Sequence, residues 1–521
     1  MPHTMRPRLR AAAVALSALV LGLGGAVIPA ATQAASGPLV IAYPGGPRTL
    51  NSWLAYDLTS DAMILNVYDQ LITYAQVKVG GQVQGTLNAF SPMLAERWTS
   101  NAQKTVYTFF LRKNAEFSNG DPLTAADVVW TYQNGMKANG NLSFLASEAA
   151  IKTVAEVNPY EVRITLAHPD PMFLPIIAMY PFSILDSKVA AKEPASYWNT
   201  HELGSGPYEL QSLQPASQAV FVLNPHYWGP RPAYSQVILK FITSPSVRQQ
   251  LVEGGSVQVA LNMSPLALQT MAKSPAVTEH TNLSETVVYF GMNEADPPFN
   301  NKLVRQALSY AVPYSSLISQ VMYGQAAPMN SPVPIGMPTH TGAGWNYSYN
   351  LAKAKALLAK AGYPHGFTFT FTLDPANADW VQDATLLQAS FAKIGVTMKI
   401  TQVADAEFQT LLAAKKMQAF ISSWDSFVND PGYHLGFLFG KGMQTNATNY
   451  TNPIVDSLLP KAEFDANTAQ RNADYATIQK TINQDAAWLD LYQYKWTVVT
   501  YHGVSGYVFY PDTLLRFWAF K

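Results

Sequence analysis

Apolar residues follow strand-like and then helix-like spacing, and they do so in two separate parts of the chain. Residues 39–43 form an apolar run typical of a buried strand, and residues 61–74 carry apolar side chains on one helical face. The pattern starts again in the second half, where residues 367–372 alternate strictly and residues 384–393 are helical. This repeated alternation predicts two α/β lobes. Ligands of such proteins usually bind between the lobes, which indicates a cleft-binding protein or a two-domain enzyme.

Length and composition exclude several other classes of protein. The chain has 521 residues, more than one core accommodates, and 48% of them are hydrophobic whereas only 13% are charged. This composition excludes a disordered protein. Basic and acidic residues balance at 34 each, so there is no basic field and we expect no nucleic-acid partner. The chain has no cysteine, which excludes disulfides, thiolate metal sites and a lipid-modified cysteine.

The N-terminus has the three parts of a signal peptide. Three arginines lie within the first ten residues, an apolar run covers residues 11–28, and small residues follow at 30–34. We therefore predict a signal peptide over residues 1–34, cleaved near Ala34, and an exported protein in the periplasm or at the cell surface. The alternative is an uncleaved anchor, because an apolar run of about 18 residues can just span a bilayer.

The sequence carries none of the common catalytic or metal-binding motifs. HExxH and GxSxG are both absent, and no two of the nine histidines are four residues apart, as a helical metal pair requires. Isolated histidines such as His340, His365 and His434 are usually structural or solvated. We expect no catalytic residue, no metal site and no cofactor.

One polar and aromatic segment follows an apolar strand. Residues 424–431 read WDSFVNDP and come directly after the predicted strand at 419–421. The place where a strand leaves an open α/β sheet is a common ligand position. A purely structural role, with Trp424 filling the core, is equally compatible with the pattern.

Several ordered motifs resemble the extracytoplasmic solute-binding proteins of peptide/nickel ABC importers, the oligopeptide- and dipeptide-binding family. The longest match covers residues 94–129 and contains LAERW, YTFFLRK and FSNGDPLTAADVV. Further matches, in chain order, are GSGPY at 204–208, NPHYW at 224–228, PPF at 297–299, VRQAL at 304–308, KAKALL at 353–358, AGYP at 361–364 and NYTNP at 449–453. The resemblance covers nearly the whole chain after residue 43.

The resemblance implies a periplasmic-binding-protein-like α/β fold with two main lobes, a hinge of two chain crossings and one extra lobe. The implied ranges are 35–72, 190–283 and 497–521 for lobe I, 73–189 for lobe II, and 284–496 for lobe III, which closes on the ligand. The crossings fall near residues 283–284 and 496–497. Closure around a ligand would shift an equilibrium between open and closed forms, and the importer would recognise the closed form.

The resemblance also implies which residues contact the ligand. These candidate ligand-binding residues are Tyr56, Leu58, Asn262, Tyr289, Gly291, Trp424, Asp425, Phe427 and Tyr494. In peptide binders of this family an aspartate three residues after the tryptophan pairs with the peptide α-ammonium, but that position is Phe427 here. A buried ammonium group needs a charge partner. Asp425 is the candidate substitute.

The predicted function is capture of a solute, most plausibly an oligopeptide or dipeptide, and its delivery to the membrane permease of an ABC importer. A non-peptide solute is the alternative, because Phe427 and the many aromatic side chains suit an oligosaccharide or a blocked peptide. A metal complex gains no support from the histidine spacing. A secreted hydrolase would need a nucleophile–base pair, and a chemoreceptor-coupled binder would differ only in its partner. The family implies a monomer.

Overall fold

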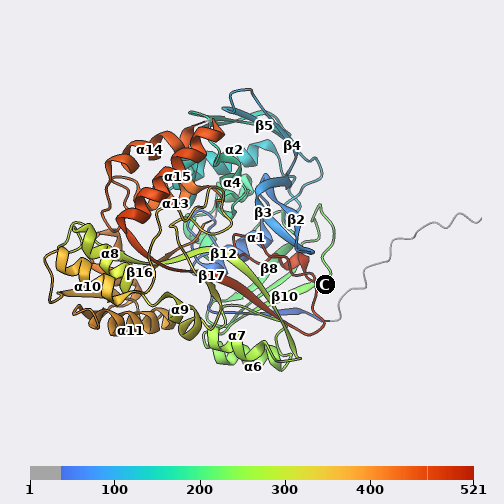
Figure 1. The fold of residues 1–521 in the computed structure, drawn as a ribbon. Coiled ribbons are helices and arrows are strands. Elements are labelled where there is room, and N and C mark those ends of the chain that lie inside the picture. The colour runs from blue at the N-terminus through green and yellow to red at the C-terminus, as the bar shows by residue number, and fades with distance from the viewer. Residues whose placement is uncertain (1–36, 427, 466) are drawn as a thin grey trace, which may run out of the picture.

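The computed structural model describes residues 37–426, 428–465 and 467–521. Its strands form an eleven-stranded mixed sheet, a four-stranded sheet and a two-stranded sheet. Figure 1 shows the large sheet running through the middle of the molecule, with α8 (Lys302–Ala311), α10 (Leu351–Lys360) and α11 (Ala378–Ala392) grouped to the left and α6 (Pro245–Glu253) and α7 (Pro265–Met271) below the sheet. The architecture is mixed α/β, as the alternating pattern predicts. The predicted signal peptide lies outside the described residues, and no helix within them is both long and apolar enough to cross a membrane.

Two long antiparallel strands hold the large sheet together. They are β12 (Val277–Met292) and β17 (Trp488–Tyr501), neighbours at the centre of the strand order. The pairing register shifts between Leu283 and Val287, so a bulge interrupts the ladder. Ser284 bonds across the bulge, because its hydroxyl donates to the Tyr494 carbonyl at 2.8 Å. The bulge lies where the family resemblance implies the crossings, and the hinge and lobe boundaries stay predictions.

Lobe I lies on the β17 side of this pair. Its strands, in order away from β17, are β11 (Val259–Ala260), β1 (Leu39–Tyr43), β10 (Gln236–Phe241), β9 (Gln218–Leu223) and β8 (Tyr208–Gln214). Its helices are α1 (Leu58–Val67), α6 (Pro245–Glu253) and α7 (Pro265–Met271), and α5 (Ser187–Ala190) lies at the predicted boundary with lobe II. Ile41 packs into the core that contains α1, and its neighbour Ala42 packs into the core that contains α6 and α7. Strand β1 is therefore buried on both faces, which explains its continuous apolar run.

Lobe III lies on the β12 side. Its strands, in order away from β12, are β16 (Ala419–Trp424), β14 (Thr368–Leu373) and β15 (Thr397–Gln402), and β13 (Ala326–Ala327) pairs with β17. Its helices are α8 (Lys302–Ala311), α9 (Tyr314–Ser316), α10 (Leu351–Lys360), α11 (Ala378–Ala392), α12 (Asp405–Ala413), α13 (Pro431–Phe439), α14 (Pro453–Phe464) and α15 (Thr468–Asp485). In β14, Phe369 and Phe371 are buried whereas Thr368 and Thr370 are exposed. The alternation at 367–372 thus reflects a strand whose first residues are buried on one face and exposed on the other.

Lobe II contains the two smaller sheets. The four-stranded sheet has the order β4 (Ala95–Ser100), β5 (Val106–Leu111), β7 (Glu161–Leu166) and β6 (Ile151–Asn158), and β2 (Ile72–Val79) pairs with β3 (Gln82–Pro92). The helices are α2 (Ala125–Gly135), α3 (Asn141–Glu148) and α4 (Phe173–Ile177). Helix α2 begins at the predicted capping box, where the Asp127 carboxylate accepts the Thr124 backbone N–H at 2.8 Å.

One predicted helix is shorter than its pattern. The apolar spacing over 61–74 predicts a single helix, but α1 ends at Val67 and strand β2 begins at Ile72. Asp69 lies between them and accepts hydrogen bonds from the Ser205 hydroxyl at 2.9 Å and the Trp228 indole N–H at 2.8 Å. These contacts with lobe I fix the chain in a turn, which local spacing does not reveal.

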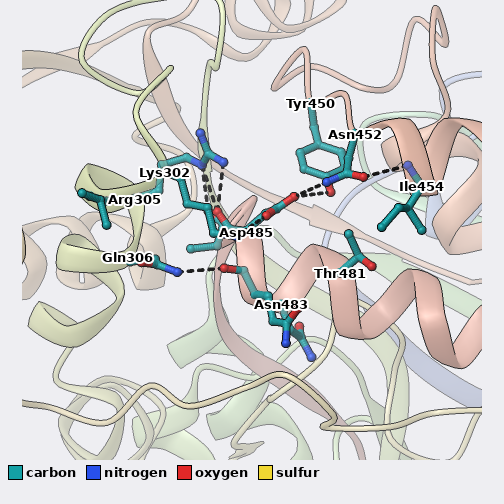
Figure 2. A network of polar contacts seen from close by, with 12 residues as sticks. Lys302, Arg305, Gln306, Tyr450, Asn452, Ile454, Thr481, Asn483 and Asp485 are labelled. Carbon is teal, nitrogen blue, oxygen red and sulfur yellow. Dashed lines mark hydrogen bonds and ion pairs between the residues drawn. The ribbon is translucent and has the colours of Figure 1, made fainter. Parts of the chain in front are cut away.

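A buried carboxylate ties the last helix of lobe III to its neighbours (Figure 2). Asp485 ends α15, and its Oδ1 pairs with Lys302 Nζ at 2.7 Å. Its Oδ2 accepts the Tyr450 hydroxyl at 2.9 Å and the Asn452 amide at 2.7 Å. Arg305 donates to the Asp485 carbonyl at 2.9 Å. The network joins α8 and the loop before α14 to the C-terminal end of α15, three residues before β17 begins.

Replacing Asp485 with alanine should destabilise lobe III. The change leaves the buried Tyr450 hydroxyl and the Asn452 amide without their shared acceptor, and it should cost about 3 kcal/mol of the free energy of unfolding. Chemical denaturation measures this loss. The matched control is Lys302→Met, because the Lys302 side chain is 47% exposed and its removal should cost less than about 1 kcal/mol. Equal losses for the two variants would contradict the proposed role of the network.

Candidate functional site

Two adjoining cavities lie between lobe I and lobe III, beside the β12–β17 crossing. The larger has a volume of ≈ 480 Å³, and the smaller has a volume of ≈ 240 Å³. Both are lined by Asn262, Thr286, Asp425 and Trp496, so together they form one cleft. Their combined size falls in the range of about 300–1,000 Å³ that is typical of small-molecule sites.

The sheet register places Asp425 in the cleft. Strand β16 pairs antiparallel with β12, and Trp424, the last residue of β16, lies opposite Val287. The next residue, Asp425, therefore lies beside the bulge of β12, where the Thr286 hydroxyl donates to its Oδ1 at 2.5 Å. The side chain is exposed to the cleft. Although part of its surface stays accessible, the surrounding walls of the cleft desolvate the Asp425 carboxyl and raise its pKa, and the hydrogen bond from Thr286 opposes that shift.

The smaller cavity is acidic. Besides Asp425 it is lined by Asp61, Glu285 and Asp512. Burial raises the pKa of Glu285 to about 8 and the pKa of Asp61 well above its ordinary value, so both side chains favour the neutral form. The Asp512 carboxylate is paired with Arg516 at 2.5 Å. Of these four residues, Asp425 is the exposed one, and its carboxylate accepts the Thr286 hydroxyl.

The larger cavity carries positive groups at its other walls. Arg248, on α6, is buried and donates to four backbone carbonyls, those of Ile242, Thr243, Leu261 and Asn262. A guanidinium has five N–H donors, so one remains. Lys495 lines the same cavity, and so do residues 376–379 at the N-terminus of α11. A helix N-terminus favours anions. Asp379 also lies there, and burial raises the pKa of its carboxyl.

Five of the nine candidate ligand-binding residues line the cleft. Tyr56 and Leu58 line the smaller cavity, Tyr494 lines the larger one, and Asn262 and Asp425 line both. Tyr56 is 65% exposed, and its hydroxyl accepts a hydrogen bond from Arg48 at 2.9 Å. These five residues come from four distant parts of the sequence, which the fold brings together.

The other candidate residues lie elsewhere. Tyr289 is buried and stacks on Trp488 with ring centroids 3.5 Å apart, so it packs inside lobe III. Gly291 faces Phe420 so closely that an added Cβ would lie 2.4 Å from its ring. Trp424 packs against Tyr433 and the core of lobe II. Phe427 lies outside the described residues.

Sequence reasoning missed most of the charged groups that line the cleft. Arg248 lies in an ordinary helical segment, and nothing local distinguishes it from a solvent-exposed arginine. Thr286 and Glu285 lie within β12, and the local sequence gives no sign of the bulge there. The described residues contain no group of three or more metal-ligating side chains that could hold a metal ion. The arrangement suits a solute that carries both positive and negative charge.

The fold and the cleft define a class of protein, namely an α/β binding protein whose ligand site lies between its lobes. The family of bacterial extracellular solute-binding proteins, family 5 (middle region), matches residues 89–446. The chain therefore belongs to the family 5 solute-binding proteins, whose members serve ABC importers.

Several relatives match over nearly the full length. The chain is 28% identical to the probable D,D-dipeptide-binding periplasmic protein DdpA of Escherichia coli, over 95% of this chain and 96% of that protein. It is 26% identical to heme-binding protein A of Haemophilus influenzae, over 76% of this chain and 78% of that protein. The structure of HbpA2 from Haemophilus parasuis is 26% identical, with a TM-score of 0.80, and the match covers 93% of this chain and 99% of that one.

A more distant structure shares the fold. NikA from Brucella suis, solved in complex with Fe(III)-EDTA, is 21% identical with a TM-score of 0.83, covering 93% of this chain and 100% of that one. The predicted periplasmic-binding-protein-like fold is thus confirmed. The relatives carry names for different solutes, and the family consists of substrate-binding proteins.

Glu285 should make the stability of the protein fall as the pH rises. Its pKa in the folded state is about 8, above the ordinary value of 4.5, so between these values the folded protein holds a proton that the unfolded chain has lost. The stabilisation is complete below about pH 4.5 and is lost as the pH rises through about 8. Glu285→Gln should therefore gain stability relative to the wild type across this window, as measured by denaturation at several pH values.

The exposed Glu96→Gln variant is the matched control, and its stability difference from the wild type should not grow with pH. A Glu285→Gln variant whose difference also stays constant would contradict a neutral Glu285 in the cleft.

Proposed function

We propose that this protein captures a short peptide with free termini between lobe I and lobe III and delivers it to the permease of an ABC importer. The observation that carries the proposal is the separation of charge in the cleft. Asp425 lines both cavities, whereas Arg248, Lys495 and the α11 N-terminus line only the larger one. A zwitterionic peptide matches this arrangement, with its ammonium near Asp425 and its carboxylate near the positive groups.

Peptide binders of this family have an aspartate three residues after the tryptophan, where this chain has Phe427. In this proposal Asp425 takes the role of that aspartate. Its carboxylate reaches the cleft, and Thr286 fixes its orientation while leaving its other oxygen free to accept an ammonium N–H. A nearby cation would favour the charged form of Asp425 and oppose the effect of burial. The name of the Escherichia coli relative, a probable D,D-dipeptide-binding protein, agrees with a peptide solute.

The lobes close over the peptide in this proposal, and the bulge of β12 is the hinge. Arg48 of lobe I already pairs with Asp405 of lobe III at 3.7 Å, although both side chains are about half exposed and the pair contributes little. A monomer that exists in open and closed forms needs only such weak contacts, because the ligand itself supplies the differential binding energy.

Asp425→Asn should weaken the binding of free dipeptides to tripeptides by about 10- to 100-fold, since a hydrogen bond to a charged group contributes about 1.5–3 kcal/mol. Isothermal titration calorimetry measures the change. N-acetylated peptides should bind weakly to both proteins. Peptide amides should bind less tightly than free acids, because they lack the carboxylate that pairs with the positive groups of the cleft. Asp379→Asn is the matched control, because Asp379 lines the larger cavity but not the smaller one, whereas Asp425 lines both.

The peptide proposal would be contradicted if blocked peptides or oligosaccharides bound the wild type with the same affinity as free peptides and Asp425→Asn did not change that affinity. A thermal-shift screen finds the solute class in that case. A ligand at 100 times its dissociation constant adds about 2.7 kcal/mol to the free energy of unfolding.

We also propose that the protein is exported and that its signal peptide is cleaved near Ala34. The three arginines, the apolar run and the small residues at 30–34 support this. Mass spectrometry of the protein purified from its native source should find a mature N-terminus close to residue 35. An intact Met1 would instead support an uncleaved anchor.

A further inference from the structure

Lobe II and lobe III also meet along α13 and α14, through residues that line neither cavity of the cleft. Phe144 of α3 lies against Phe437 of α13 with ring centroids 5.5 Å apart, and the ring of His168 lies 4.3 Å from that of Phe464 at the end of α14. Tyr433 and Phe437 are buried among core residues of lobe II. Burial of this apolar surface favours the joined arrangement of the two lobes.

Carboxyl groups from both lobes lie at the same contact. Glu148 is the last residue of α3, and Asp170 lies just before α4, so both belong to lobe II. Glu463 lies in the last turn of α14, on the lobe III side. The charges of Glu148 and Asp170 act on Glu463 across the contact. When ionised, the carboxylates of the two lobes therefore repel each other.

The contact also desolvates these carboxyl groups. Asp170 is 4% exposed, and its Oδ1 accepts the Met172 N–H at 2.7 Å. Its Oδ2 has no hydrogen-bond partner within residues 37–426, 428–465 and 467–521. Burial raises the pKa of Asp170 to about 6 and that of Glu463 to about 7, and the neighbouring carboxylates raise the pKa of Glu463 further. Burial raises the pKa of Glu148 as well.

The other ionisable groups at the contact do not cancel this repulsion. Asp430 at the start of α13 and Arg471 of α15 form an ion pair at 2.6 Å and largely neutralise each other. The charges of Arg471 and His168 oppose the rise in the pKa of Asp170 without abolishing it. Burial raises the pKa of the neighbouring tyrosines, so they stay neutral; these are Tyr107, Tyr433 and Tyr475.

We infer that this contact makes the closure of lobe III depend on pH. The neutral carboxyl groups of Glu148, Asp170 and Glu463 let the apolar contact hold lobe II and lobe III together at acid pH, and their ionisation drives the lobes apart. The inference rests on the lobe movement in the proposed function but not on the identity of the solute.

The direction of the effect follows from Glu463. Its pKa is about 7 in the closed form, above the ordinary value of 4.5 that solvent would restore when the lobes separate. The closed form therefore holds a proton that the open form has lost. The contribution of Glu463 to closure is complete below about pH 4.5 and is lost as the pH rises through about 7.

Energy transfer between two fluorophores tests the inference without any peptide. The chain has no cysteine, so Lys152→Cys on β6 and Lys355→Cys on α10, both at exposed positions, can be labelled selectively. Every protein compared also carries Glu285→Gln, which removes the titration of the cleft. The ratio of open to closed molecules should rise about 10-fold from pH 5 to pH 8.

Glu463→Gln should keep the lobes closed at pH 8 and reduce this rise to about 2- to 3-fold, because a neutral amide replaces the carboxylate. Asp170→Asn should act in the same direction. The matched control is Glu407→Gln, an exposed glutamate of lobe III on α12, which should leave the rise unchanged.

A ratio that does not change with pH, or a Glu463→Gln variant that behaves like Glu407→Gln, would overturn the inference and leave the capture of a peptide intact. Free dipeptides should shift the molecules toward the closed form at both pH values. A ratio that responds to pH and to Glu463→Gln but not to dipeptides would support the inference and contradict the proposed function.

Discussion

The antiparallel pairing of β12 with β17 is the constraint on which the rest of the structure depends. These strands are 16 and 14 residues long and lie side by side in the sheet, so they belong to both lobes at once. Residues Val277–Leu283 pair with the end of β17 on the lobe I side, and Val287–Gly291 pair with its beginning on the lobe III side. The bulge between these stretches interrupts the ladder directly beside the cleft. A change in geometry at the bulge would therefore move the walls of the cleft relative to one another.

The acidic side chains of the cleft gather at the same crossing of β12 and β17. Glu285 and Thr286, which belong to the bulge, line the smaller cavity, and desolvation raises the pKa of Glu285, Asp61 and Asp425 there. Glu285 and Asp61 respond by favouring the neutral form, whereas Asp512 is neutralised by an ion pair. The cleft thereby avoids the repulsion of four buried negative charges. It keeps Asp425 as the carboxylate available to a cation.

Much of the local structure could be predicted from the sequence. The run at 39–43, the alternation at 367–372 and the capping box at Thr124 each form the expected element, because side-chain period and cap hydrogen bonds are local properties. The helix expected over 61–74 was too long, since Asp69 is held by residues more than a hundred positions away. Of the candidate site, Asp425 and Asn262 were found through family motifs, and Arg248 was not found at all.

The sequence by itself determined the family, the α/β class and the segments from which the cleft is built, because ordered motifs and apolar periods survive in the order of residues. Only the tertiary structure decided which of those segments meet. It placed Asp425 and Arg248 on one cavity, moved Tyr289 into the core of lobe III, and brought Glu148 and Glu463 to one contact between lobe II and lobe III. Charge in the cleft depends on burial and on neighbours far away in the chain, and neither is encoded by local spacing.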